Sequence, residues 1–196
     1  MRGVDELCIL DIGATPEGRG PDLDLVRELS EACFIPLTVG GGVRSVDDAN
    51  NLLRAGADKV AVKTAHGIIP ELSRRFGAQA VVAAVDYHDH DRDSALRHVL
   101  NLALAGAGEV MLTAMDREGM LDGYDIELIR QVSGSVNIPV IAHGGCGNYD
   151  HMLQAVRAGA SAVAAGAMFQ FTDNTPAGAA EYLHDHGVEV RLREAA

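Results

Sequence analysis

An internal repeat is the feature that most restricts the fold. The segment IPLTVGGGVRSVDDANNLLRAGADKVAVK (35–63) aligns without a gap with IPVIAHGGCGNYDHMLQAVRAGASAVAAG (138–166), 103 positions later. Eleven residues recur unchanged at this spacing, and DLDLVREL (22–29) recurs as DIELIRQV (125–132). Because chance produces only a few such matches, the repeat indicates that one half of a larger repeating fold has been duplicated.

Seven short apolar runs alternate with seven amphipathic stretches. The runs are continuously apolar, as in parallel strands that are covered on both faces, and most of the stretches end at glycine, as helices commonly do. We expect strands over 6–12, 35–41, 59–64, 80–86, 109–116, 138–145 and 161–169. We expect helices over 22–32, 45–56, 69–77, 94–106, 124–134, 148–159 and 175–187.

The repeat and the alternation together predict an α/β fold, a TIM-type (βα)₈ barrel with its first βα unit missing and seven parallel strands. The unit at 80–106 has no counterpart, because a position 103 residues earlier would precede Met1. We therefore expect a single domain over 1–196, an incomplete barrel built from two repeat-related halves. Its open strand edges would favour self-association.

Composition excludes several classes of partner. The 196 residues carry a net charge of −12, which disfavours nucleic acid and anionic membranes. No apolar stretch is long enough to span a bilayer, and the first residues do not resemble a signal peptide. Cys8, Cys33 and Cys146 form no C-x-x-C pair, which favours reduced thiols and a cytoplasmic protein.

Two glycine pairs follow repeat-related strands, at the edge where TIM-type barrels place their active sites. They are Gly41–Gly42 and Gly144–Gly145, and each precedes a helix. Exposed backbone N–H groups at such a point can hold a phosphate. The alternative is that the glycines only permit tight turns. Two pairs in equivalent positions favour phosphate binding, and they suit a substrate with a phosphate at each end.

Several segments in series resemble the cyclase subunit of imidazole glycerol phosphate synthase, over residues 3 to about 192. They include VDELCILDI, IPLTVGGGVRS, GAGEVMLTAMDREG and IPVIAHGGCGN. The resemblance implies a lyase or cyclase of histidine biosynthesis that requires neither a cofactor nor a metal. It implies a glutaminase subunit as partner, whose ammonia would cleave and cyclise a bis-phosphorylated ribulosyl nucleotide.

The resemblance also implies roles for individual residues. Asp86 matches the general acid of the family, and Asp11 matches a second carboxylate at the candidate catalytic site. Glu6, Lys59 and Glu109 match charges at the ammonia entrance, although a purely structural ring of salt bridges is the alternative. The implied substrate- and phosphate-binding residues are Gly41, Gly42, Lys63, Thr64, Thr113, Asp116, Gly144, Gly145, Gly166 and Ala167.

Three departures from the family favour a second reading. The general base, which the family has on its first strand, and the loop after that strand have no counterpart, and a short YHDHDRD (87–93) replaces a long hairpin. We therefore expect weak turnover by this chain alone. The alternative is an impaired paralogue that serves as an ammonia conduit or scaffold with a glutaminase in acetamidino-sugar biosynthesis. His88 and His90 are more simply explained as solvated residues than as metal ligands.

Overall fold

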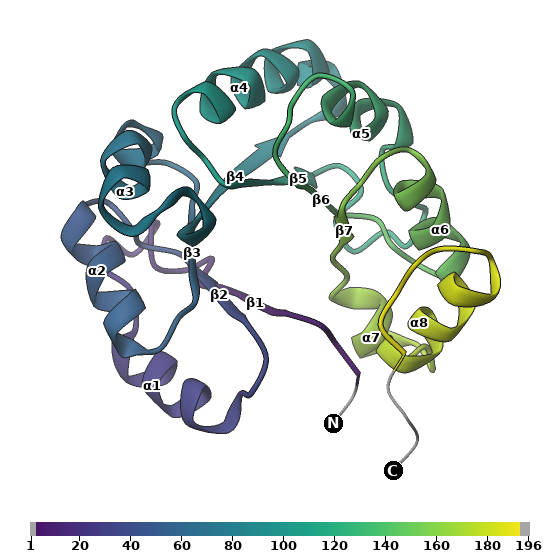
Figure 1. Cartoon of the computed structure of the whole chain (residues 1–196), viewed down its shortest axis with the longest axis horizontal. Coiled ribbons are helices and arrows are strands. Elements are labelled where there is room, and N and C mark those ends of the chain that lie inside the picture. Colours follow the sequence, from purple (N-terminus) through teal and green to yellow (C-terminus); the bar gives the residue numbers. More distant parts are fainter. Residues whose placement is uncertain (1–2, 193–196) are drawn as a thin grey trace. The chain divides into compact units, whose positions relative to one another are not determined.

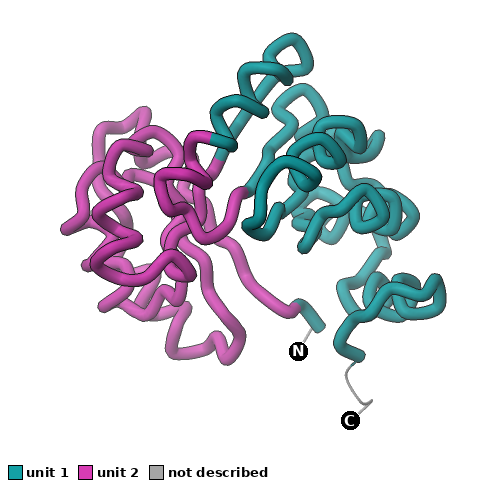
Figure 2. The backbone as a smooth tube through the Cα atoms, turned by 45° about the horizontal axis from the view of Figure 1, so that its top comes forward, with its two compact units in different colours: residues 1–4, 85–100, 111–196 teal, residues 5–84, 101–110 magenta. Residues whose placement is uncertain are grey.

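The computed structural model describes residues 3–192. The chain divides into two compact units, which share the elements around residues 85–110 (Figure 2). Unit 2 takes residues 5–84 and 101–110, and unit 1 takes residues 1–4, 85–100 and 111–196. The expectation of a single domain remains a prediction.

Unit 2 is built from successive strand and helix pairs (Figure 1). Its elements are β1 (Leu7–Leu10), α1 (Leu23–Ala32), β2 (Leu37–Gly40), α2 (Val46–Ala55), β3 (Lys59–Val62), η1 (His66–Ile68), α3 (Ile69–Phe76) and η2 (Ala78–Ala80). β1, β2, β3 and the first part of β4 (Val81–Tyr87) pair in parallel. Buried Leu37, Val60 and Val82 form part of its core.

Unit 1 continues the same alternation. Its elements are the end of β4, η3 (Asp89–Asp91), most of α4 (Arg92–Leu104) and of β5 (Glu109–Ala114), α5 (Ile126–Ser133), β6 (Val140–His143), α6 (Tyr149–Arg157), β7 (Ala162–Val163), α7 (Ala167–Phe171) and α8 (Pro176–Asp185). β6 and β7 pair in parallel. Met168, Leu153 and Ile129 belong to its apolar core.

The strand order confirms the expected fold class. The seven strands follow one another in the sheet in the order β1 to β7. A TIM-type fold has this sequential order, whereas a doubly wound sheet reverses its order. One expectation is wrong in part: the last strand covers two residues, and Ala167–Phe169 of the expected strand lie in helix α7. No helix in residues 3–192 is long and apolar enough to cross a bilayer.

The repeat is visible in the positions where helices begin. Asp22 and Asp125 precede α1 and α5, and Ser45 and Asn148 precede α2 and α6, again 103 residues apart. In each case the side chain accepts a hydrogen bond from the backbone N–H three residues later. These caps satisfy N–H groups that the first helical turn leaves without a partner. They fix where each helix starts, and so where the preceding loop must end.

Candidate active site

Asp11 follows β1 and is held by its own loop. Its Oδ1 accepts hydrogen bonds from the backbone N–H groups of Gly13 and Ala14, both at 3.1 Å. Arg19 donates through Nη2 to Oδ1 at 3.0 Å and through Nη1 to Oδ2 at 2.5 Å. The hydrogen bonds and positive charge of Arg19 lower the pKa of Asp11. The carboxylate is therefore kept ionised and anchors the loop that it begins.

Gly41 and Gly42 follow β2, where the chain turns tightly beneath this loop. Both have left-handed φ angles, +106° and +69°. A Cβ atom on Gly42 would lie 2.8 Å from the carbonyl oxygen of Arg19, and one on Gly41 would collide with the carbonyl oxygen of Asp11. The backbone packing thus requires glycine at both positions. The turn alternative therefore accounts for these glycines, and binding of an anion would be an additional role.

Lys63 and Thr64 follow β3, the strand next to β2. Gly40 at the end of β2 pairs with Ala61 of β3. The glycine turn after β2 and the residues after β3 therefore leave neighbouring strands at the same edge of the sheet. The side chains of Lys63 and Thr64 are both exposed. This edge of unit 2 gathers the four residues expected for one phosphate.

Asp86 lies in β4, one residue before the strand ends. Its neighbours Val85 and Tyr87 are buried, whereas Asp86 is half-buried. Side chains alternate between the two faces of a strand, so Asp86 lies on the opposite face from these two residues. The following turn, η3, starts after His88. The strand therefore positions Asp86, and His88 rather than Asp86 is the residue that precedes η3.

Asp116, in the loop after β5, binds the segment that follows β4. Its Oδ1 lies 2.7 Å from Nδ1 of His88, and its Oδ2 accepts the backbone N–H of Asp89 at 2.8 Å. The Asp89 N–H and His88 lower the pKa of Asp116, and Asp116 raises the pKa of His88. His88 also stacks on His90 at 5.6 Å. Within the described residues, no group of three or more His, Cys, Asp or Glu side chains is placed so that it could hold a metal ion.

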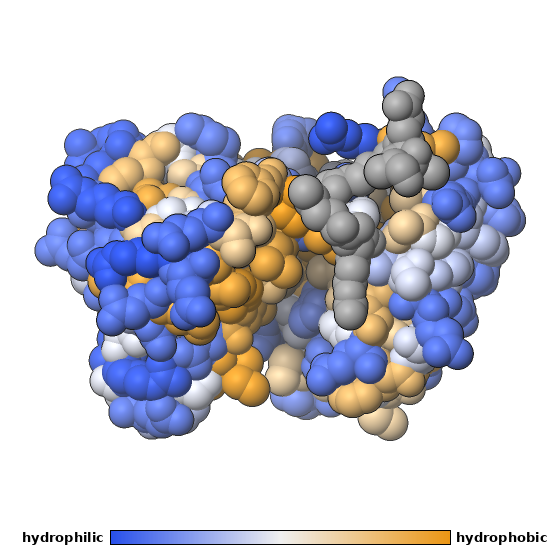
Figure 3. All heavy atoms as spheres, turned by 90° about the horizontal axis from the view of Figure 1, so that it is seen from below, coloured by the Kyte–Doolittle hydropathy of each residue, from blue (hydrophilic) through white to orange (hydrophobic). Residues whose placement is uncertain are grey.

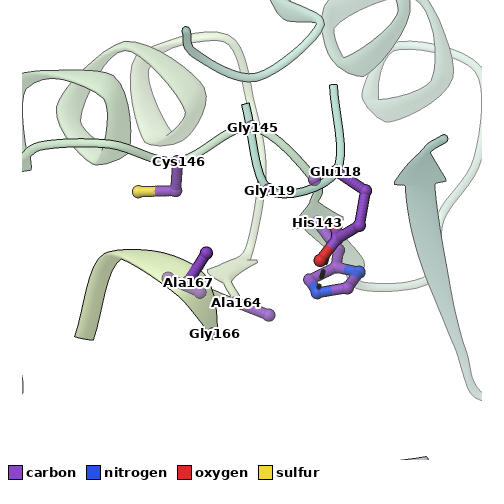
Figure 4. A pocket seen from close by; sticks show the side chains of 10 residues that line it. Glu118, Gly119, His143, Gly145, Cys146, Ala164, Gly166 and Ala167 are labelled. Atoms are coloured by element: carbon purple, nitrogen blue, oxygen red, sulfur yellow. Dashed lines mark ion pairs between the residues drawn. The ribbon is translucent and has the colours of Figure 1, made fainter. Parts of the chain in front are cut away.

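His143, the last residue of β6, lies between Thr113 and Glu118, and Figure 4 shows it beside Glu118. Its Nδ1 is 3.2 Å from Oγ1 of Thr113, which is buried in β5. Its Nε2 is 3.7 Å from Oε2 of Glu118, whose side chain is 42% exposed. The contact with Glu118 is too long for a hydrogen bond. In the neutral tautomer that carries its hydrogen on Nε2, Nδ1 accepts from the Thr113 hydroxyl and the N–H points toward the carboxylate side.

A small cavity of about 10 Å³ lies beside His143, and we call it the glycine cup (Figure 4). It lies wholly within unit 1, and all four residues expected for the second phosphate line it. The lining residues are Glu118, Gly119, His143, Gly144, Gly145, Cys146, Ala164, Ala165, Gly166 and Ala167.

The glycines of the cup differ in the space around them. Gly145 has φ +95°, and a Cβ atom there would collide with the carbonyl oxygen of Gly123. A Cβ atom on Gly144 would lie 2.7 Å from the carbonyl oxygen of Ala114. Gly166 has φ −111°, and a Cβ atom there would meet nothing within 4 Å. A side chain at Gly166 would therefore alter the cup without straining the backbone.

Glu6, Lys59 and Glu109 meet in unit 2 near the amino ends of the strands. Lys59 donates through Nζ to both carboxylate oxygens of Glu6 at 3.0 Å and to Oε1 of Glu109 at 2.7 Å. Only 16% of the Lys59 side chain is exposed. Burial acts to lower the pKa of Lys59, but its hydrogen bonds to Glu109 and Glu6 outweigh that effect and raise it. Lys59 thus stays charged between two carboxylates.

The structure adds polar residues that the sequence patterns do not single out. Arg19 and Glu118 are two of them, as described above. A third is buried Asp125, which accepts hydrogen bonds from Nε of Arg92 at 2.6 Å and from the hydroxyl of Tyr87 at 3.3 Å. Asp125 lies in the repeated segment 125–132, but no local pattern reveals its distant partners.

Seven sequential βα units, with carboxylates and glycines where strands end, define an α/β protein of the TIM-barrel type. A family model described as "Histidine biosynthesis protein" matches residues 1–175. The imidazole glycerol phosphate synthase subunit HisF of Pyrobaculum aerophilum is 46% identical over 208 aligned residues, which cover 97% of this chain and 82% of that protein. The chain belongs to the histidine biosynthesis protein family.

Proposed function

We propose that the protein is the cyclase subunit of an imidazole glycerol phosphate synthase and acts in histidine biosynthesis. The reaction uses ammonia to cleave and cyclise a ribulosyl nucleotide that carries a phosphate at each end. The observation that carries this proposal is the HisF relative, 46% identical over 97% of this chain. The two glycine turns, Gly41–Gly42 and Gly144–Gly145, lie 103 residues apart at the carboxyl ends of strands, where they could bind phosphate in addition to permitting the turns. We also propose a cytoplasmic location, on the sequence argument from the cysteines.

Each glycine turn would take one phosphate of the substrate. In unit 1 the phosphate would bind in the glycine cup, to backbone N–H groups of Gly144, Gly145, Gly166 and Ala167. In unit 2 it would bind at Gly41–Gly42, with Lys63 and Thr64 at the neighbouring strand end. Backbone donors are already in position and lose little freedom when they bind, which favours a charged ligand.

Catalysis would depend on Asp86. A carboxyl group at the end of a strand can donate a proton as the imidazole ring closes. Asp11 is the second candidate, but its two contacts with Arg19 and its lowered pKa make it a weak base. Asp11 could accept a proton only after its ion pair with Arg19 has broken. Thr113 and Asp116, on β5 and in its following loop, would contact the body of the substrate.

The charged cluster of Glu6, Lys59 and Glu109 would form the entrance for ammonia supplied by a glutaminase subunit. It lies near the amino ends of the strands, away from Asp11 and Gly41 at their carboxyl ends. Phe34, which precedes β2, and Leu104, which ends α4, are 82% and 88% exposed at the same end of the unit. Figure 3 shows apolar residues reaching the surface among hydrophilic ones. Exposed apolar side chains suit a protein partner.

A turnover assay with ammonium salt in place of a glutaminase tests the catalytic proposal. Asp86→Asn should lower kcat by about 10²–10⁴-fold, the contribution of one general acid. The matched control is Asp91→Asn, which removes an exposed carboxylate from η3. Equal kcat values in Asp86→Asn and the parent would refute the role of Asp86.

The conduit or scaffold alternative predicts a different result from the same assay. A chain that binds a glutaminase and releases its ammonia, but never consumes the ribulosyl substrate, would overturn the cyclase proposal. Neither the family match nor the HisF relative favours that alternative.

A further inference from the structure

The glycine cup contains a carboxylate where the proposed function requires an anionic ligand. Glu118 lines the cup, and its Oε2 lies 3.7 Å from Nε2 of His143 (Figure 4). The lining residues include no other carboxylate. Glu118 therefore forms part of the wall of the cup beside His143, where a bound phosphate would meet its negative charge.

The size of the cup supports this view. The enclosed part of the cup, about 10 Å³, has room for roughly one water molecule. A phosphate group has five heavy atoms and would therefore also occupy the open mouth of the cup, where Glu118 lies. The backbone walls at Gly144 and Gly145 are tightly packed. The Glu118 side chain is 42% exposed, so it is the part of the wall that has room to move away.

The surroundings of the cup favour an anion once Glu118 has left. Arg117 packs behind the cup, since its Cβ lies 3.0 Å from the position of a Cβ on Gly145. Its Nη1 donates to the carbonyl oxygen of Gly123 at 3.4 Å, and its Nε is buried without a hydrogen-bond partner among the described residues. His143 then presents an N–H at Nε2 while Thr113 remains on Nδ1. The imidazole of His143 and the backbone N–H groups of the glycines would then face the ligand, whereas the guanidinium of Arg117 donates to the carbonyl oxygen of Gly123 and does not line the cup.

We propose that Glu118 is an internal competitor for the glycine cup, and that a phosphate of the substrate displaces it and takes over His143 as a ligand. This inference rests on the proposed function, because it assumes that the cup binds phosphate. On this inference, Glu118 weakens the binding of phosphate to the cup and so raises its Kd. It makes His143, which the phosphate would contact only after the displacement, a specificity-determining residue.

Titration with inorganic phosphate, followed by calorimetry and by the amide resonances of Gly144, Gly145 and Gly166, tests the inference. Glu118→Gln should tighten the Kd for phosphate about fivefold or more, the factor for removing one charge about 4 Å from an anion. Glu127→Gln, which removes an exposed carboxylate from α5, should leave the Kd unchanged. His143→Ala added to Glu118→Gln should reverse the gain.

The outcomes separate this inference from the proposed function. If Gly166→Leu abolishes phosphate binding but Glu118→Gln does not tighten it, the cup binds phosphate and the competitor role is refuted. If Gly166→Leu leaves the Kd unchanged, or if neither the parent nor Glu118→Gln binds phosphate, both the cup assignment and the competitor role are wrong. Thermal unfolding of every variant checks that each is folded. A side chain at Gly166 meets nothing within 4 Å at its Cβ, and the Glu118 side chain is 42% exposed, so neither substitution should unfold the protein.

Discussion

Replacing Lys59 with methionine should destabilise the protein by about 2–3 kcal/mol. The side chains of Lys59 and Glu109 are only 16% and 17% exposed, so their 2.7 Å hydrogen bond is sheltered and contributes about 1.5–3 kcal/mol. The Glu6 side chain is 46% exposed, so its contact contributes about 0–1 kcal/mol. Without Lys59 the two carboxylates also repel each other. For a chain of this size the loss lowers Tm by about 5–10 °C.

Urea denaturation of the parent and the variant measures this loss. Arg27→Met is a matched control, because it breaks an ion pair with Asp24 whose side chains are 56% and 95% exposed; its cost should stay below about 0.5 kcal/mol. Adding Glu109→Gln to Lys59→Met should restore part of the stability, since it removes the carboxylate left without a counter-charge. If Lys59→Met is no less stable than Arg27→Met, the reasoning is wrong.

Three further predictions follow from contacts within single units. Asp125→Ala should cost about 3–5 kcal/mol in urea denaturation, because it leaves Arg92 and the Tyr87 hydroxyl without their partner; a cost below 1 kcal/mol would contradict this. The lowered pKa of Asp11 means that its ion pair with Arg19 stabilises the fold above about pH 4 and that this stability is lost as the pH falls through the lower folded pKa. Asp11→Asn should therefore weaken the dependence of the urea midpoint on pH between about 2 and 5. β1 is an end strand with alternating exposed side chains, so sedimentation at micromolar concentration should show self-association, and a stable monomer would count against it.

Much of the fold follows from the sequence, because the repeat and the apolar runs are local signals. All seven expected strands are present, and the helix starts at Asp22 and Asp125 can be read from the repeat. Helix α7 was missed because a short apolar run such as SAVAAGAMF fits a strand and a buried helix equally well. Helix α4 starts at Arg92, two residues before the expected helix at 94–106. The preceding acidic, histidine-rich segment has no apolar residues at helical spacing, so the sequence does not mark this start.

The site was predictable to a smaller extent. The positions of Gly41 and Gly144 at strand ends follow from the pattern, but the backbone atoms that approach them do not. The pairing of Glu118 with His143 depends on how the loop after β5 folds over β6, which a single sequence does not encode locally. The ion pair between Arg19 and Asp11 was not predicted either, because it too depends on how a loop folds. Loops place these side chains, and the packing of distant segments places the loops.

The helix caps at Asp22 and Asp125 have different consequences for the order of folding. Asp22 binds the N–H of Leu25, three residues away, so the start of α1 can form from nearby residues alone. Asp125 also holds Tyr87 and Arg92, which lie 38 and 33 positions earlier in the chain. The local cap of α5 can form in the same way, because Oδ1 of Asp125 accepts the N–H of Leu128. The bonds of Oδ2 to Tyr87 and Arg92 need β4 and α4 in place, and contacts between distant positions form more slowly. The two duplicated helix starts therefore differ in one respect: only the carboxylate of Asp125 also joins segments that are distant in the chain.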